Sequence, residues 1–263
     1  MRKYLFIYKT EFKSNIKYIS NLLMGSIGYI IHIFIFMNLW ICLYSDSSKL
    51  INGYDVNQMI WYIIITEIIW SCVNGRSLCT KVSNDIKSGS IAYNLNKPYN
   101  YVGYKLSSHL SVSTIKLFIY TFIGIVLGFV FLKSFPKINI IGIIFVLISI
   151  ILAIVINSLL SLFTSLFSFI MEDSTPLYWV YSKIILVIGT MFPIEFFPKY
   201  LQKILKFSPI YVVCYGPAKL FVDFNYKDSI KILIAQIIYL IISYILCELL
   251  YRKGAKKLNV NGG

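Results

Sequence analysis

Charged residues are scarce in this chain, and acidic ones above all. Of its 263 residues only 14% are Asp, Glu, Lys or Arg, and Asp and Glu together number 11. Hydrophobic residues make up 58%, and the mean hydropathy is +0.73. A water-soluble domain of this size could not cover so much apolar surface, so the composition excludes an ordinary soluble fold.

Several catalytic and binding motifs are also missing. The sequence has no GxxxxGK[ST], the loop that holds ATP phosphates, and its two histidines, His32 and His109, are too far apart for HExxH. No Ser/His or paired-Asp motif lies within an apolar block, which argues against an intramembrane enzyme. The five cysteines lack CxxC spacing and are interpreted as packing residues. No catalytic residue, metal ligand or cofactor site is expected in this chain.

Long apolar blocks make up most of the sequence. A helix needs about 20 apolar residues to cross the hydrocarbon core of a bilayer. Six blocks are long enough to be considered: residues 22–44, 56–73, 110–132, 138–171, 177–192 and 230–251. The first is too long for a signal peptide, and the fourth must tilt, break or project from the membrane. The sequence therefore predicts an all-α integral membrane protein with six transmembrane helices in a single transmembrane domain, residues 1–263.

The distribution of Lys and Arg predicts the orientation. The net charge is +14, and the basic residues lie mainly between the apolar blocks. In that position they indicate topology and contact with membrane lipid rather than with nucleic acid. Most of them fall on the side shared by the N-terminus, the loop 74–109 and the C-terminus, although the segment 193–229 is basic too. We therefore expect a multi-pass protein of the cell membrane with both termini in the cytoplasm.

Two polar segments on the inner side have a helical pattern. Lys9, Lys13 and Lys17 recur every four residues, which predicts an amphipathic elbow helix within residues 1–21 at the membrane surface. In the loop 74–109, Asn84 or Asp85 can cap a short helix with a small apolar face. A loop with its own amphipathic helix is suited to being held by a partner.

The outer segment, residues 193–229, is broken by prolines. They are Pro193, Pro198, Pro209 and Pro217, and Glu195 lies between the first two. Prolines stop or divide helices, and non-helical backbone at membrane depth must be satisfied by protein or water. We expect this segment to be re-entrant, with short broken helices.

Two of these segments resemble a known family. The stretch DIKSGSIAYNLNKP, residues 85–98, is similar to the loop between the second and third spans of ABC-2 type permeases. The stretch FPIEFFPKYLQKILKFSPIYVVCYGPAKLF, residues 192–221, is similar to the outer end of the fifth span in the same family. The resemblance implies a permease subunit of an ABC exporter. It would pair with a second permease, identical or related, and with cytoplasmic ATPase subunits that hold ATP and Mg.

The resemblance also assigns a role to the inner loop. It implies that this loop receives the force of the ATPase as a coupling helix. The residues expected to take part are Asp85, Ile86, Lys87, Ser88, Gly89, Ile91, Leu95, Lys97 and Pro98.

Polar residues inside the blocks are costly in lipid and therefore candidates for function. Glu67 lies near the middle of the second block, where it either joins helices through a hydrogen bond or marks the transport route or permease interface. His32 and Glu248 have weaker claims. The fourth block has one small polar face that either packs helices or lines a path: Asn157, Ser161, Thr164, Ser165 and Ser168. Gly124 and Gly128 form a GxxxG of the helix-packing kind.

One other class of transporter stays open as an alternative. A passive channel or secondary transporter with six spans usually has inverted repeats or helices broken at mid-depth, and neither is evident. An amphipathic or lipid-like substrate is expected, but the residues do not identify it. They also do not separate a homodimer from a heterodimer of permeases.

Overall fold

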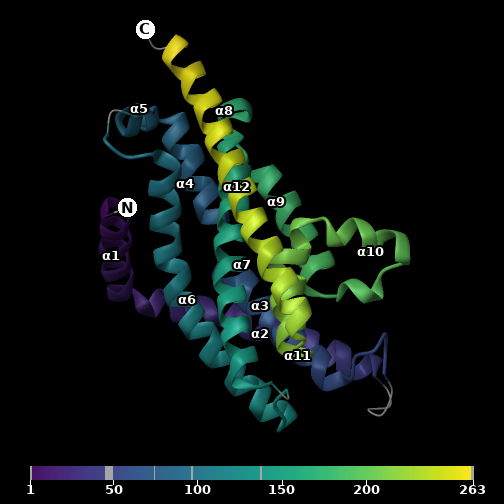
Figure 1. The fold of residues 1–263 in the computed structure, drawn as a ribbon. Coiled ribbons are helices and arrows are strands. Elements are labelled where there is room, and N and C mark those ends of the chain that lie inside the picture. The colour runs from purple at the N-terminus through teal and green to yellow at the C-terminus, as the bar shows by residue number, and fades with distance from the viewer. Residues whose placement is uncertain (1, 45–49, 74, 96, 137, 262–263) are drawn as a thin grey trace.

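The computed structural model describes residues 2–44, 50–73, 75–95, 97–136 and 138–261, without the side chains of Leu95 and of residues 257–261. This part of the chain is almost entirely helical (Figure 1). The long helices are α2 (Ile19–Leu43), α3 (Val56–Cys72), α6 (Tyr101–Leu132), α7 (Ile140–Leu166) and α12 (Tyr226–Asn261). The shorter ones are α1 (Arg2–Lys17), α4 (Gly75–Lys87), α5 (Ser90–Leu95), α8 (Ser168–Met171), α9 (Thr175–Ile184), α10 (Lys199–Lys206) and α11 (Gly216–Val222).

Five stretches of the described chain are long and apolar enough to cross a membrane. They contain α2, α3 with α4, α6, α7 with α8, and α12. The predicted fifth span, residues 177–192, is instead built from the ten-residue α9 and a six-residue π-helix, η1 (Ile185–Thr190). The all-helical, multi-pass character is confirmed, and the sixth crossing stays a prediction.

Two predicted helix boundaries are wrong. The third span was expected to begin at Leu110, but α6 begins at Tyr101, where the side-chain oxygen of Asn100 accepts a hydrogen bond from the Gly103 N–H at 3.1 Å. The last helix likewise extends beyond the expected 230–251 at both ends. Hydropathy marks the part of a helix that suits lipid, whereas polar residues continue both helices outside it.

Helix α3 is the centre of the bundle. In the candidate span that contains α3, 72% of the apolar 18-residue segment is buried inside the protein. The corresponding segments of α2, α6 and α12 are only 22–28% buried. Trp61 of α3 packs directly on Gly128 of α6, where an added Cβ would lie 2.3 Å from the indole ring. Gly124, one turn earlier, faces Tyr29 and Ile64 in the same way. The predicted GxxxG pair therefore lets α6 approach α2 and α3 closely.

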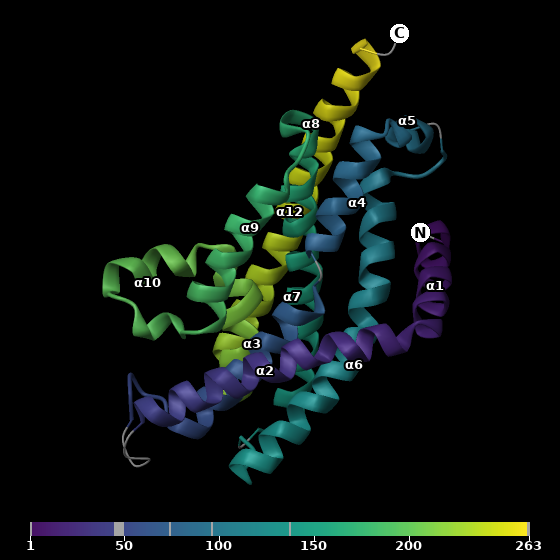
Figure 2. The same cartoon turned by 180° about the vertical axis from the view of Figure 1, so that it is seen from behind.

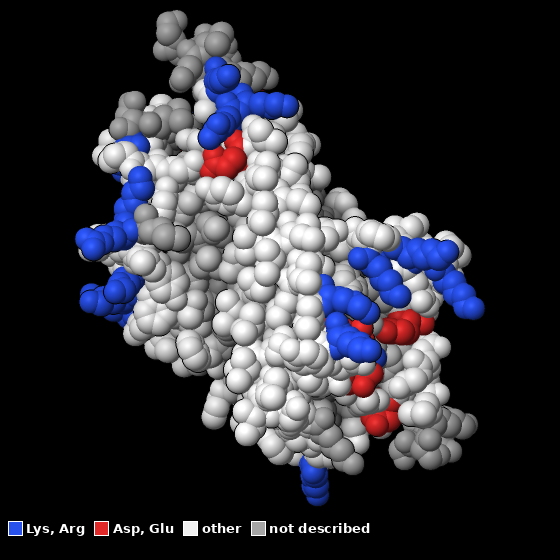
Figure 3. All heavy atoms as spheres, in the orientation of Figure 1, with Lys and Arg blue, Asp and Glu red and all other residues white. Residues whose placement is uncertain are grey.

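The outer surface of the long helices is apolar. Large hydrophobic side chains on α2, α6, α7 and α12 point outward, among them Phe122 and Ile140. Figure 3 shows a broad uncharged surface between the groups of Lys and Arg near the ends of the molecule. A monomeric soluble protein rarely exposes so large an apolar surface. Such a surface is suited to contact with lipid, as expected for membrane-spanning helices.

The first helix, α1, lies beside the N-terminal part of α6 (Figure 2). The Tyr4 hydroxyl accepts a hydrogen bond from the Asn100 N–H at 3.0 Å, and its ring packs where a Cβ on Gly103 would lie 2.8 Å away. Residues 1–21 were expected to form a helix, and the structure has one from Arg2 to Lys17. Its position at a membrane surface stays a prediction.

Two π-helices face each other near the outer segment. They are η1 and η3 (Tyr211–Tyr215). An added Cβ on Gly189 of η1 would lie 2.9 Å from the Cys214 sulfur of η3, so the two backbones approach closely. A π-turn contains more residues than an α-turn, is rare, and occurs frequently at functional sites.

Candidate functional site

The predicted coupling segment forms two helices, α4 and α5, at one end of the molecule beside α8 and the end of α12 (Figures 1 and 2). Helix α4 begins at Gly75, where a Cβ would lie 2.4 Å from the Tyr178 ring and 2.7 Å from the Ser161 hydroxyl. Only glycine permits this close contact with α7 and α9. A turn at Gly89, which has a φ of +70°, then separates α4 from α5. The segment is a helical hairpin rather than an extended loop.

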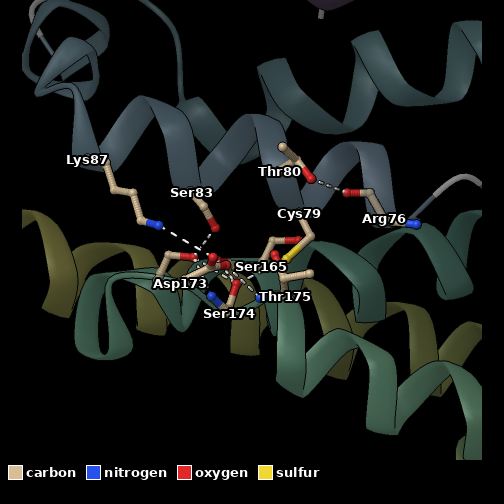
Figure 4. A network of polar contacts seen from close by, with 10 residues as sticks. Arg76, Cys79, Thr80, Ser83, Lys87, Ser165, Asp173, Ser174 and Thr175 are labelled. Carbon is tan, nitrogen blue, oxygen red and sulfur yellow. Dashed lines mark hydrogen bonds and ion pairs between the residues drawn. The ribbon is translucent and has the colours of Figure 1, made fainter.

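A buried cluster of small polar side chains joins α4 to the α7–α9 region (Figure 4). We call Cys79, Ser83, Ser168 and Ser174 the serine cluster. The hydroxyl oxygens of Ser83 and Ser168 lie 2.6 Å apart, and those of Ser168 and Ser174 lie 2.7 Å apart. The Cys79 sulfur lies 3.1 Å from the Ser174 oxygen. Hydrogen bonds between uncharged groups fix the position of α4 without burying a charge.

A surface ion pair extends this contact at the end of α4. Lys87 Nζ lies 3.4 Å from Asp173 Oδ2, in the turn between α8 and α9. The Thr175 backbone N–H donates to the other Asp173 oxygen at 2.9 Å. The hydrogen bonds from Thr175, and to a smaller extent Lys87, lower the pKa of Asp173. Both side chains of the pair are about half exposed, so the pair itself contributes little stability.

Asp85 connects α4 to α6. Its carboxylate lies 2.7 Å from Lys105 Nζ and accepts a hydrogen bond from the Tyr101 hydroxyl at 2.8 Å. The side chains of Asp85 and Lys105 are only 22% and 11% exposed, so this pair is shielded from water far better than the pair of Lys87 with Asp173. A short, shielded ion pair with an added hydrogen bond is a strong connection between two helices.

The rest of the predicted coupling residues divide into buried and exposed ones. Ile91 is buried against a small apolar core that includes Tyr101 and Tyr251. Lys97 lies over the exposed Tyr93 ring at 4.2 Å from its centroid, and the Pro98 carbonyl accepts a hydrogen bond from Lys3. Other predicted residues are Ile86, packed at the edge of that core, and Ser88, whose hydroxyl bonds to the Asn84 carbonyl at 2.7 Å. The side chain of Leu95 lies outside the described residues.

Glu67 is completely buried within the bundle. Its Oε2 lies 3.7 Å from Nδ1 of His32, which is half exposed on α2. Among the residues that the structure describes, neither Glu67 oxygen has a hydrogen-bond partner. Its neighbour Thr66 bonds to the carbonyl of Thr190 at 3.2 Å, so α3 is tied to η1 at this depth. A buried carboxyl without a hydrogen bond is costly.

The small polar face of α7 is covered by other helices of the same chain. The Tyr181 hydroxyl donates to Asn157 Oδ1 at 2.7 Å, Ser161 lies beside Gly75, and Ser168 belongs to the serine cluster. Ser165 and Thr164 bond back to the Ser161 carbonyl within α7. All these side chains are buried. Within one chain they pack helices, and their place on a transport route stays a prediction.

Glu195 organises the outer segment. It accepts hydrogen bonds from the Tyr215 hydroxyl and, at 3.2 Å, from the Tyr54 hydroxyl. Pro193 precedes the 3₁₀ turn η2 (Ile194–Phe196), and Pro198 precedes α10. Pro217 lies in the first turn of α11, and Pro209 comes just before η3. The predicted short, broken helices are present, and Glu195 joins them to Tyr54, which lies just before α3.

Some residues of the site were not found from the sequence. Lys105 and Tyr101 were placed in a loop, so their contact with Asp85 was missed. The serine cluster was missed because Ser83 and Ser174 lie in different segments. One signal was available, because Gly75, Cys79 and Ser83 are small residues four positions apart and so lie on one face of α4.

Comparisons with known proteins agree with this architecture. Residues 15–262 match the model of a family described as "ABC-2 family transporter protein". A search of curated proteins found no match.

Proposed function

Because the chain belongs to the ABC-2 family of transporter membrane proteins, we propose that it is the permease subunit of an ATP-driven exporter. It pairs with a second permease, identical or related, and with two cytoplasmic ATPase subunits. ATP and Mg bind to those subunits, since this chain has no phosphate-binding loop of the GxxxxGK[ST] type. The observation that carries the proposal is the attachment of the α4–α5 hairpin to the rest of the bundle.

A coupling element must transmit force to the membrane helices without bending. The hairpin is held at three points: by Asp85 to α6, by the serine cluster to α7–α9, and by Ile91 to the core that contains Tyr251 of α12. A displacement of α5 is therefore passed to α6, to the α7–α9 region and to α12 together. The exposed Tyr93 on α5, with the partly buried Lys97 lying over its ring, is the surface offered to the ATPase.

The orientation follows from this assignment. The α4–α5 hairpin and both termini lie in the cytoplasm, and α10 lies on the outer side. Groups of Lys and Arg near the N-terminus and the C-terminus favour this topology, although the region of α10 is basic as well (Figure 3). The membrane is the cell membrane, and the predicted sixth crossing is formed by α9 and η1.

The substrate class is amphipathic or lipid-like. The route lies between the two permeases and is bounded by the apolar faces of the long helices. Glu67 and the polar face around Asn157 and Ser161 are buried in the single chain, so they would meet a polar part of the substrate only after the helices that cover them move apart. The exposed apolar surface of the long helices supports this choice, because a lipid-like molecule can enter from the bilayer without crossing water.

Purification tests the partners. The tagged chain, expressed from its own locus, should copurify with an ATPase and with a second permease subunit. Recovery of this chain alone would overturn the proposal. Transport of a fluorescent phospholipid in reconstituted vesicles that needs an ion gradient and ignores ATP would favour a secondary transporter instead.

Cysteine labelling tests the orientation. In a background with the exposed Cys42 replaced by Ser, the variants Tyr93→Cys on α5 and Ile204→Cys on α10 both carry exposed positions. A membrane-impermeant maleimide added to intact cells should label position 204 and leave position 93 unlabelled until the cells are opened. Labelling of position 93 from outside would place α5 outside the cell, where a cytoplasmic ATPase could not bind it, and would contradict the proposal.

A further inference from the structure

A polar pocket of about 410 Å³ lies between α1, α4 and α6. Helix α4 contributes Ser77, Lys81 and Asn84, which are spaced four and three residues apart and so share one face. Cys79 and Ser83 lie on the face that packs against α7–α9. The pocket is therefore separate from the serine cluster, on the other side of the same helix.

The pocket holds two uncompensated charges of opposite sign. Lys81 is on α4 and Glu11 is on α1. Within the described ranges neither side chain has an ion-pair partner within 4.0 Å. The other two charges in the lining, Asp85 and Lys105, neutralise each other at 2.7 Å. A cation and an anion thus border one cavity without meeting.

The remaining lining residues add hydrogen-bond donors and a buried wall. The Ser108 hydroxyl and the Asn84 amide can donate hydrogen bonds to a ligand, and His109 is a buried wall of the cavity. The pocket lies where α6 passes from polar residues to its apolar stretch. On α1, Leu5, Phe6 and Ile16 are exposed beside basic residues, the pattern of a helix at a membrane surface. With α1 at the membrane surface, as predicted, the pocket would be at the depth of lipid headgroups.

We infer that this pocket binds the headgroup of a membrane lipid that carries both a phosphate and a primary ammonium, as phosphatidylethanolamine does. Lys81 and the donors of Asn84 and Ser108 contact the phosphate, and Glu11 accepts from the ammonium. Its volume lies within the range of small-molecule sites and has room for the glycerol as well as the headgroup. A purely anionic headgroup would leave the Glu11 carboxylate facing a phosphate, and a choline group has no N–H to donate.

This binding site does not depend on ATP or on the ATPase subunits. A lipid held there would connect α1 to the face of α4 that carries Lys81, and so would stabilise the hairpin from the side opposite to the serine cluster. The inference therefore goes beyond the proposed transport function and can fail separately from it.

The test is lipid binding to the full-length chain, delipidated in detergent and examined by native mass spectrometry. Dioleoyl phosphatidylethanolamine should bind about tenfold more tightly than phosphatidylglycerol or phosphatidylcholine with the same acyl chains. Equal binding of the three lipids to the wild-type chain would overturn the inference without any variant. Soluble phosphoethanolamine should compete weakly. Competition as strong as that of the lipid would assign the site to a free metabolite and overturn the lipid assignment.

Two variants test the contributions of the two charges to lipid binding separately. Lys81→Gln should weaken binding of the phosphatidylethanolamine by about tenfold. Glu11→Gln should abolish the preference for it and leave phosphatidylglycerol bound at least as well as in the wild type. The matched controls, Lys13→Gln on α1 and Asp228→Asn on α12, make the same charge changes outside the pocket and should bind as the wild type does. Wild-type selectivity in both pocket variants would refute the site.

Discussion

The carboxylate of Asp85 on α4 lies 2.7 Å from Nζ of Lys105 on α6, and the Tyr101 hydroxyl donates to the same oxygen at 2.8 Å. This contact joins the proposed coupling hairpin to a membrane helix through charged atoms that are largely shielded from water. It is the strongest polar connection of α4, because the pair of Lys87 with Asp173 is longer and half exposed.

Replacing Asp85 by Asn should therefore weaken both stability and coupling. Loss of the charge leaves Lys105 partly buried without its partner, which costs about 1–3 kcal/mol. Thermal unfolding in detergent measures this cost, and Asp228→Asn is the control for removing an exposed carboxylate. In the reconstituted complex, ATP hydrolysis should continue while transport of the fluorescent phospholipid falls. Unchanged coupling would show that force does not pass through this contact.

Gly75→Ala should destabilise the chain because its Cβ would lie 2.4 Å from the Tyr178 ring. Overpacking of this kind costs about 1–3 kcal/mol. Thermal unfolding is the measurement. The double variant with Tyr178→Leu should recover part of the loss. Gly28→Ala in α2 has open space around the new Cβ and should be neutral or slightly stabilising. Equal effects of the two glycine variants would contradict the close packing of α4.

The Asp173 carboxylate predicts a small dependence of stability on pH. Its pKa is lowered in the folded chain, chiefly by the hydrogen bonds from Thr175. Its contribution is therefore fully present above the unfolded pKa of about 4 and is lost as the pH falls through the lower folded value. The stability difference between the wild type and Asp173→Asn should shrink on acidification below about pH 4. A difference that grows on acidification would mean that the pKa is raised.

Glu67→Leu should stabilise the isolated chain by about 1 kcal/mol or more, because it removes a buried carboxyl that has no hydrogen-bond partner in the described part of the chain. Thermal unfolding of the purified chain measures this gain, and Glu67→Gln is the polar control. A lower stability of Glu67→Leu would contradict this prediction, because it would mean that the carboxyl is stabilised within the chain itself, with His32 at 3.7 Å as the nearest charged group.

Much of the fold could be predicted from hydropathy and from the positions of the prolines. The apolar blocks place α2, α3 and α7 to within a few residues, and the prolines of the outer segment mark its short helices. Hydropathy failed where a helix leaves the apolar environment. The first turns of α6 are polar because they contact α1 and Asp85 instead of lipid, so they were taken for a loop.

The candidate site was harder to predict, for a different reason. Asp85 was singled out, but its partners depend on where α6 begins. The serine cluster joins residues of α4, α8 and the turn before α9, and a single sequence contains no information on which small residues face each other. Glu67 could be recognised alone because a carboxyl in an apolar block is unusual wherever it points.

The pair of π-helices has a mechanical consequence. Each wide turn holds extra backbone that an ordinary α-turn does not need. Converting one such turn to α geometry rotates everything beyond it by about 100° and shifts it by about 1.5 Å along the axis, without breaking the helix. Since η1 and η3 bracket the segment with Glu195 and α10, such a conversion in either of them would reorient this segment relative to α3.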